Sequence, residues 1–198
     1  VDSVWEMLGP LLAGVPTVII PDETVLDPEG FIALLDRHGV TRIVLVPTLL
    51  RVLLDHAPDL GKRLPALKMW SVSGEILTSD LVRRFNLACP DRKLINLYGS
   101  SEVAADVLIH ELQDVDVGGP VPIGKPIANT QVYVLDRAGQ PAAVGMPGVI
   151  HAGGACLALG YWSKPDLTAE RFKANPIAEA PSPTLFNTGD RGVYQADG

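Results

Sequence analysis

Short apolar runs alternate with amphipathic stretches through the first half of the chain. The apolar runs predict buried strands, and the stretches between them carry apolar residues at helical spacing and predict helices. Gly39 should end the first helix, and Thr48 should cap the second. Because apolar strands that alternate with helices form parallel sheets covered on both faces, the pattern predicts an α/β fold with flanking helices. The strands are expected at residues 17–21, 42–47, 67–73 and 93–98, and the helices at residues 29–38, 48–56 and 78–88.

The pattern changes near residue 118, where Gly118, Gly119 and Pro120 follow one another. Beyond this point, short β-like runs are separated by Gly and Pro, which is typical of hairpin-rich β structure. We therefore expect an α/β subdomain at residues 1–118 and a smaller, β-rich, barrel-like subdomain at residues 119–198. Within the second part, we expect strands at residues 131–135 and 148–153, a turn at residues 136–139 and a short helix at residues 166–172.

Composition narrows the classes of function. The 198 residues include 16 basic and 23 acidic side chains and carry a net charge of −7, which argues against a nucleic-acid partner. No apolar run is long enough to predict a membrane span. Cys89 and Cys156 lack metal or redox spacing, so a reducing, cytoplasmic setting is expected. The chain begins at Val1 rather than Met and stops in a turn signal at Gly198, which predicts a piece of a longer protein.

Candidate chemistry gathers where predicted strands end. Residues 73–75 (Ser-Gly-Glu) and 98–99 (Tyr-Gly) both follow strands, and ligands of parallel sheets bind at these carboxyl ends. Tyr98 is suited to stack on a flat heterocycle, although most such aromatic residues belong to the core. Glu102 offers a hard oxygen ligand to Mg²⁺. Asp190, in Phe-Asn-Thr-Gly-Asp, offers an acceptor for ribose hydroxyls or is an ordinary turn residue.

Taken together, these motifs resemble the adenylation domains of nonribosomal peptide synthetases, within the acyl-adenylate-forming, AMP-binding superfamily. Residues 96–102 (Asn-Leu-Tyr-Gly-Ser-Ser-Glu) are similar to the family motif N-x-Y-G-P-T-E, and residues 186–190 end like its Y-R-T-G-D motif. Residues 4–6 with 11–14, and the glycine-rich run 148–154 with the residues up to 172, match two further motifs. The resemblance covers the whole chain and implies part of the large N-terminal core of such a domain.

The resemblance implies a role for each matching residue. Tyr98 is expected to stack on adenine, Glu102 to hold Mg²⁺ and Asp190 to bind the ribose of ATP or AMP. Gly74, Glu75, Asn96 and Gly99 complete the expected nucleotide site, and Ser101 with Glu102 is expected to serve the reaction at the α-phosphate. Two departures stand out: Ser100 replaces the usual Pro, and Asn187 replaces the usual Arg.

The family's reaction joins a carboxylate to the α-phosphate of ATP and releases pyrophosphate. The acyl group then passes to the phosphopantetheine thiol of a carrier protein, expected here within the same polypeptide. The family's phosphate loop and its mobile lysine-bearing subdomain are expected outside residues 1–198, so we predict no turnover from this chain alone.

The substrate pocket implied by the resemblance favours a small β-amino acid, with β-alanine first. Val1 stands where most relatives place the Asp that binds an α-ammonium group, and Asp106 offers a carboxylate nearby. Asp106 is otherwise an exposed loop residue, and Ser3 with Glu6 also fits a helix capping box. The expected pocket positions are Val1, Asp2, Trp5, Val44, Ser71, Ser73, Leu97, Ala105 and Asp106.

Two alternatives stay open at this stage. An acyl- or aryl-CoA ligase of the same superfamily shares the adenylation chemistry but binds no amine, so the carboxylate of Asp106 has no role there. A degenerate scaffold module keeps the fold without catalysis, although the retention of Tyr98, Glu102 and Asp190 together argues against it.

Overall fold

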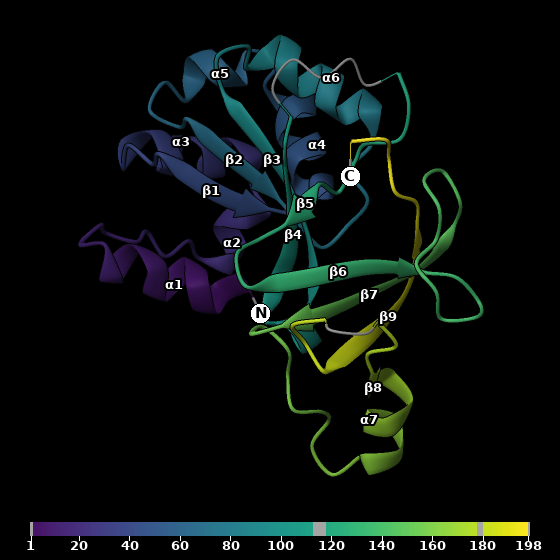
Figure 1. Cartoon of the computed structure of the whole chain (residues 1–198). Coiled ribbons are helices and arrows are strands. Elements are labelled where there is room, and N and C mark those ends of the chain that lie inside the picture. The colour runs from purple at the N-terminus through teal and green to yellow at the C-terminus, as the bar shows by residue number, and fades with distance from the viewer. Residues whose placement is uncertain (1, 113–117, 178–179, 198) are drawn as a thin grey trace. The chain divides into compact units, whose positions relative to one another are not determined.

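Helices and parallel strands alternate in the first part of the computed structural model, which describes residues 2–112, 118–177 and 180–197 (Figure 1). The chain divides into two compact units. The α/β unit comprises Asp2–Leu97 and Ile109–Gly124, and the β unit comprises Tyr98–Leu108 and Lys125–Gly198.

Three parallel strands form the centre of the α/β unit. Strand β1 (Arg42–Leu45) pairs with β2 (Met69–Val72), and β2 pairs with β3 (Lys93–Ser100), so that Val44 faces Ser71 and Ser71 faces Ile95. This arrangement confirms the parallel α/β pattern expected from the sequence. The helices of the unit are α1 (Asp2–Leu12), α2 (Asp22–Val25), α3 (Pro28–Arg37), α4 (Pro47–His56), α5 (Leu60–Arg63) and α6 (Ser79–Ala88).

One face of these strands carries the core. Trp70, Val72 and Leu94 are at most 1% exposed and pack with apolar residues from α3, α4 and α6. The Trp70 ring meets Phe85 of α6 edge to face, with centroids 5.7 Å apart, a favourable aromatic geometry. Burial of this strand face against the helices therefore holds the unit together.

The starts of α6 and α4 are stabilised in different ways, and only the second was expected to carry a threonine cap. The side chain of Thr78 accepts a hydrogen bond from the Leu81 amide at 3.4 Å and caps α6. Thr48 does not cap α4, because Val46 is the N-cap and Pro47 opens the helix with its fixed φ. Instead, the Glu75 carboxylate accepts a hydrogen bond from the Thr48 amide at 3.0 Å and another from the Thr48 hydroxyl. An anion at a helix N-terminus is stabilised by the exposed amides and the helix dipole.

The strand expected at residues 17–21 is absent from the described residues, and this prediction was wrong. Ile19 is 84% exposed, and no described strand pairs with this segment. A strand needs a neighbouring backbone to satisfy its amides and carbonyls. An apolar run alone therefore did not determine strand structure here.

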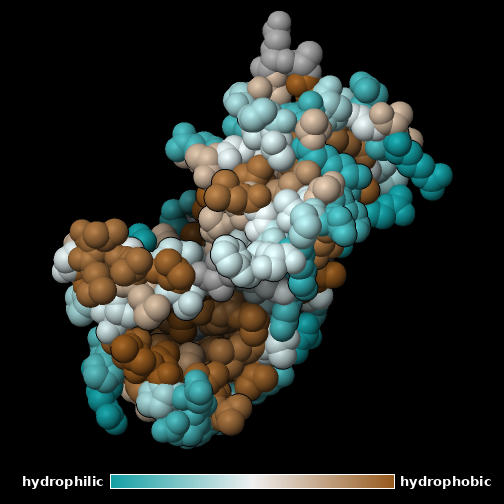
Figure 2. Space-filling model, turned by 90° about the horizontal axis from the view of Figure 1, so that it is seen from below, coloured by the Kyte–Doolittle hydropathy of each residue, from teal (hydrophilic) through white to brown (hydrophobic). Residues whose placement is uncertain are grey.

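Apolar side chains are also exposed on α1. Val4, Met7, Leu8, Leu11 and Leu12 are each at least half exposed. Figure 2 shows broad apolar areas, in brown, on the side of the molecule that it presents. The apolar residues of α1 thus contribute little to the core.

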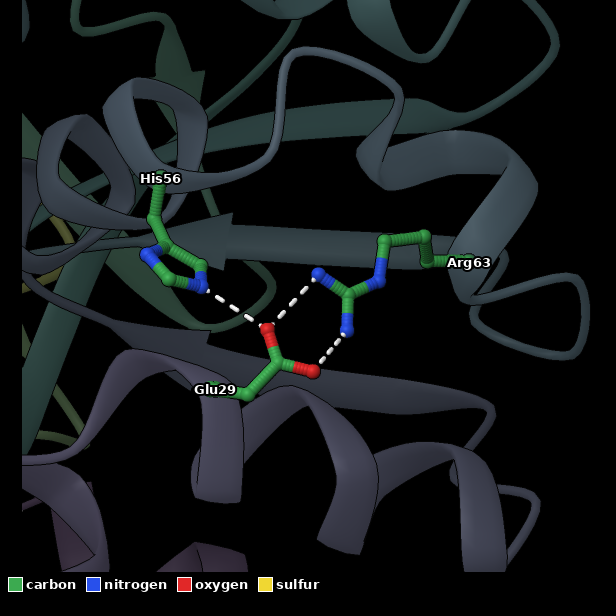
Figure 3. A network of polar contacts seen from close by, with 3 residues as sticks. All are labelled: Glu29, His56 and Arg63. Atoms are coloured by element: carbon green, nitrogen blue, oxygen red, sulfur yellow. Dashed lines mark hydrogen bonds and ion pairs between the residues drawn. The ribbon is translucent and has the colours of Figure 1, made fainter.

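An exposed ion-pair network joins three helices of the α/β unit (Figure 3). Glu29 of α3 accepts hydrogen bonds from Arg63 of α5, one of them at 3.0 Å, and contacts the His56 ring of α4 at 2.8 Å. The bonds from Arg63 and then His56 lower the pKa of Glu29 to about 2. The network keeps this carboxylate charged under ordinary conditions.

The β unit contains a separate antiparallel sheet with the order β6-β7-β9-β8. Its turn at residues 136–139 is confirmed, because the Gly139 amide donates to the Asp136 carbonyl and Gly139 has φ +76°. The other sheet has the order β1-β2-β3-β4-β5, so β3 and β4 each run from one unit into the other. The remaining elements are η1 (Ser101–Val103), β4 (Ala105–Glu111), β5 (Lys125–Pro126), β6 (Thr130–Leu135), β7 (Gly148–Gly154), α7 (Pro165–Arg171), β8 (Phe172–Ala174) and β9 (Thr184–Gly192).

Both cysteines are free thiols; Cys89 is buried and Cys156 is partly exposed. Across the part of the chain that the structure describes, none of the helices has the length and apolar character needed to cross a bilayer.

Candidate functional site

A tight turn after β3 presents the first group of candidate residues. A Cβ on Gly99 would lie 1.7 Å from the Ala105 carbonyl oxygen, so only glycine allows the two backbone segments to approach this closely. Helix η1 follows, and Ala104 and Ala105 then adopt φ angles of +57° and +83°. Such angles are costly for residues with a Cβ and concentrate at functional sites. The turn carries the exposed Ser101 and the half-buried Glu102.

Tyr98 and Asp190 meet, although 92 positions separate them. The Tyr98 hydroxyl donates a hydrogen bond to Asp190 Oδ2 at 2.7 Å. Burial raises the pKa of Tyr98 well above its usual value, and the nearby carboxylate raises it further. Tyr98 therefore stays protonated and acts as a donor to Asp190. The structure thus brings together the aromatic ring and the carboxylate that the two sequence motifs supplied.

The turn before Asp190 holds its carboxylate in place. The Thr188 hydroxyl accepts a hydrogen bond from the Asp190 amide at 3.0 Å and donates one to the Ile150 carbonyl at 2.8 Å. Asn187 Oδ1 accepts from the Gly189 amide at 2.9 Å, and Gly189 has φ +83°. These local bonds fix the Asn-Thr-Gly-Asp turn, an irregular part of β9 where its pairing with β7 shifts register, as expected for Asx and Ser/Thr turn chemistry.

Glu102 is held by a tyrosine from a distant segment. The Tyr161 hydroxyl donates to Glu102 Oε1 at 2.7 Å, and the Ala158 amide donates to the Glu102 carbonyl at 2.9 Å. Partial burial acts to raise the pKa of Glu102, but hydrogen bonds from Tyr161, a backbone amide and the Ser100 side chain, together with the charge of Arg171, outweigh it and lower the pKa. Glu102 is therefore a charged carboxylate near neutral pH.

Arg171 lies beside the turn in which Asn187 replaces the family's arginine. Its Nη1 donates to the Asn187 carbonyl at 3.4 Å, and a Cβ on Gly189 would lie 3.1 Å from the same nitrogen. A guanidinium is thus present near this turn. Sequence reasoning assigned no role to Arg171 or Tyr161, although both lie within the motif region quoted above. Their place in the chain gave no indication of their hydrogen-bond partners.

The other expected nucleotide residues belong to the α/β unit. Gly74 has φ +81°, which suits the sharp end of β2. Glu75 binds the start of α4 through Thr48, as described above. Asn96 is 5% exposed, and its amide donates to the Pro122 carbonyl at 2.9 Å. The Glu75 carboxylate and the Asn96 amide nitrogen therefore already make contacts within the protein.

Four expected pocket positions share one face of the parallel strands. Val44 and Ile95 both pair with Ser71, and Ser73 and Leu97 lie two residues beyond Ser71 and Ile95. Because side chains alternate along a strand and neighbours in register point the same way, Val44, Ser71, Ser73 and Leu97 face away from the core cluster. Ser71 and Ser73 are each 8% exposed, so small hydroxyl groups are buried on this face.

The remaining pocket positions are distributed over both units. Trp5 lies on α1 and is 40% exposed. In the β unit, Ala105 is buried, whereas Asp106 is only partly buried and is not without an interaction partner. Asp106 is thus neither a fully buried carboxylate nor a fully exposed loop residue. Val1 lies outside the described residues; Asp2 begins α1, but its side chain also lies outside them.

The donor set around Glu102 suits Mg²⁺ better than a metal held by protein ligands alone. In the described ranges, no group of three or more His, Cys, Asp or Glu side chains is arranged to hold a metal ion. Zinc sites need three or four such ligands. Magnesium is commonly bound by one or two carboxylates together with substrate phosphate oxygens. A single charged carboxylate such as Glu102 fits that second mode.

Comparisons with known proteins agree with this arrangement. A profile described as "AMP-binding enzyme" matches residues 2–162. The Drosophila melanogaster beta-alanyl-bioamine nonribosomal peptide synthetase ebony is 39% identical over 203 residues, covering 97% of this chain and 23% of ebony. The chain spans between 2% and 23% of the length of the curated relatives compared.

Solved structures of nonribosomal peptide synthetase proteins also align with this chain. The AMPPNP-bound form of the nonribosomal peptide synthetase FmoA3 (S1046A) aligns with a TM-score of 0.89 at 31% identity, over 99% of this chain and 21% of that one. The holo form of PA1221, which contains adenylation and PCP domains and is bound to a vinylsulfonamide inhibitor, aligns with a TM-score of 0.79 at 34% identity. That alignment covers 87% of this chain and 30% of PA1221.

Proposed function

Because the chain belongs to the AMP-binding enzyme family and matches its nonribosomal peptide synthetase adenylation domains, we propose that it activates a small amino acid with ATP, with β-alanine as the preferred substrate. The observation that carries the nucleotide part of this proposal is the 2.7 Å hydrogen bond between Tyr98 and Asp190. It joins an aromatic ring suited to stack on a purine with a carboxylate suited to accept ribose hydroxyls. Adenylation domains bind ATP or AMP, and the AMPPNP-bound relative supports the same ligand here.

The side chains of this chain contribute to the reaction by binding the nucleotide and orienting its α-phosphate. Tyr98 stacks on adenine and Asp190 binds the ribose, which fixes the α-phosphate relative to the turn that carries Ser101. The hydroxyl of Ser101 donates to an α-phosphate oxygen. The substrate carboxylate oxygen attacks the α-phosphorus, and the bond to pyrophosphate breaks. Correct positioning of the reactants supplies much of the acceleration in such a transfer.

Glu102 is the residue that would hold Mg²⁺. Its lowered pKa keeps the carboxylate charged, and its single-carboxylate setting fits this ion. When bound, Mg²⁺ neutralises phosphate charge that grows as pyrophosphate leaves. Glu102 itself does not transfer a proton in this scheme.

Selection of β-alanine rests on the pocket and on one relative. The strand face that carries Val44, Ser71, Ser73 and Leu97 presents only small hydroxyl groups and apolar groups at these positions. The Asp106 carboxylate binds the substrate ammonium, sharing or replacing its present contact. Ebony, a beta-alanyl-bioamine nonribosomal peptide synthetase, matches nearly the whole of this chain and supports the same choice.

The thiol of a phosphopantetheine arm on a carrier domain then attacks the acyl carbon; a thioester bond forms, the bond to AMP breaks, and AMP and the thiol proton leave. The likeness to PA1221, which contains adenylation and PCP domains, supports this partner. A cytoplasmic location remains a prediction based on the free thiols of Cys89 and Cys156.

Pyrophosphate exchange by the full-length protein tests the proposal. We expect ATP-dependent exchange with β-alanine, at least tenfold faster than with L-alanine or with propionate, which lacks the amine. Asp106→Ala should remove the preference for β-alanine over propionate. A wild-type preference for propionate would favour the acyl-CoA ligase alternative, and the absence of ATP binding would favour a scaffold module.

A further inference from the structure

The strongest unassigned feature of the site is the contact between Tyr161 and Glu102. Tyr161 comes from the loop before α7, 59 residues after Glu102, and its hydroxyl donates to Glu102 Oε1 at 2.7 Å. We propose that Tyr161 is a positioning residue, which fixes the carboxylate of Glu102 so that its second oxygen is presented to the nucleotide-bound divalent cation. This inference rests on the proposed function, because it assumes that Glu102 is the cation ligand.

Both the backbone and the ring of Tyr161 are held by neighbouring residues. The backbone amide of Tyr161 donates to Thr168 Oγ1 at 2.9 Å, and the Thr168 hydroxyl in turn donates to the Lys164 carbonyl at 2.9 Å. Its ring meets Phe172 edge to face at 5.7 Å, and Phe172 in turn contacts the buried Phe186 at 5.1 Å. The phenol therefore has little freedom to move away from Glu102.

The chain ahead of Tyr161 is shaped for this contact. Gly160 has φ +140°, and a Cβ there would lie 2.4 Å from Thr168 Cγ2. The Ala158 amide donates to the Glu102 carbonyl at 2.9 Å, so the loop binds Glu102 through its backbone as well as its side chain. Two hydrogen bonds from one loop to one residue fix both the position of η1 and the orientation of the carboxylate.

Orientation matters because the last torsion of a glutamate side chain is broad. Without a partner, the carboxylate rotates among many orientations, and ordering it on binding costs entropy. A hydrogen bond to one oxygen selects an orientation in advance. Partners of this kind behind a metal ligand typically change metal affinity or activity about 10- to 100-fold when they are removed.

Tyr161→Phe in the full-length protein removes the hydroxyl and keeps the ring. We expect at least a tenfold rise in the Mg²⁺ concentration that gives half-maximal pyrophosphate exchange. The affinity for Mn²⁺ in the presence of AMPPNP, measured by electron paramagnetic resonance, should weaken by a similar factor. The KM for β-alanine and the melting temperature should stay near wild type.

Tyr194→Phe is the matched control. The Tyr194 hydroxyl accepts from the Val134 amide and donates to the Val132 carbonyl, both at 3.2 Å, and neither bond involves Glu102. Its loss should lower the melting temperature without changing the Mn²⁺ affinity. The opposite responses of the two variants separate positioning of Glu102 from general support of the fold.

A second pair of variants covers the case in which Tyr161→Phe fails to fold. Thr168→Val removes the acceptor of the Tyr161 amide and should weaken Mn²⁺ binding in the same direction, whereas Thr168→Ser keeps the hydroxyl and should bind as wild type does. Equal Mn²⁺ affinity, within twofold, in wild type and Tyr161→Phe would overturn the inference and leave the proposed function standing. Absence of AMPPNP-dependent Mn²⁺ binding in the wild type would overturn both.

Discussion

Replacement of Gly99 by alanine tests whether the close approach of β3 and β4 positions the turn that carries Glu102. The new Cβ would lie 1.7 Å from the Ala105 carbonyl oxygen and 2.6 Å from the Asp106 Cα. Real Cβ atoms essentially never approach another heavy atom closer than 3.0 Å. The two backbone segments must therefore separate by roughly 1.3 Å, because no flexible side chain is available to move instead.

The cost has two parts. Overpacking of this kind destabilises a protein by about 1–3 kcal/mol, and a clash with backbone belongs at the upper end of that range. For a domain of this size, each kcal/mol lowers the melting temperature by roughly 2–4 °C, so a cost of about 3 kcal/mol should lower it by about 6–12 °C. The displacement also reaches η1, which lies between Gly99 and Ala105. Misplacement by about 1 Å near reacting groups can reduce the rate about a hundredfold.

Two measurements on the full-length protein check this reasoning. Differential scanning fluorimetry gives the melting temperature, and pyrophosphate exchange gives the rate. Gly119→Ala is the matched control, because a Cβ there meets no atom within 4 Å and its φ is not positive. Equal melting temperatures and equal pyrophosphate-exchange rates in Gly99→Ala and Gly119→Ala would refute the assigned role of Gly99.

Three further predictions concern other parts of the molecule. The pKa of Glu29, about 2, lies below its usual 4.5, so this carboxylate stabilises the fold above pH 4.5 and loses that effect as the pH falls to 2; Glu29→Gln should flatten the acid fall in melting temperature. Phe85→Ala should cost about 3–5 kcal/mol in urea unfolding and Leu87→Ala, at an exposed position, about 0.5 or less; equal costs would contradict the assigned core. Cys89, whose pKa burial raises to about 11, should react with iodoacetamide after Cys156; mass spectrometry that shows equal rates would refute this order.

Much of the fold could be predicted because local signals and burial agree. The helix at residues 29–38 and the strand at residues 42–47 appear as α3 and β1, within a few residues of the expected ends. The strand predicted at residues 17–21 did not form, because an apolar run specifies a strand only when a neighbouring strand pairs with it. The predicted cap at Thr48 was wrong, because Pro47 is a stronger helix start. The carboxylate of the distant Glu75 accepts the hydrogen bond from the Thr48 amide instead.

The site was predicted in its main residues but not in its supports. Motif similarity led to Tyr98, Glu102 and Asp190, and in the structure the Tyr98 hydroxyl donates a hydrogen bond to Asp190. Their assigned roles in binding remain predictions. The bond from Tyr161 to Glu102 depends on the path of a loop 59 residues away, which no local pattern specifies. Sequence thus supplied the candidate groups, while tertiary structure determined what holds them.

The passage of β3 and β4 from one unit into the other has a practical consequence for anyone who divides this chain. A cut after residue 118, where the sequence pattern changes, would leave Tyr98 on one piece and Asp190 on the other. Each piece would then lose one partner of the Tyr98–Asp190 hydrogen bond, and with it half of the proposed nucleotide site. Fluorescent nucleotide titrations of such halves should therefore show no binding, even when both halves are folded, until they are mixed and reassemble.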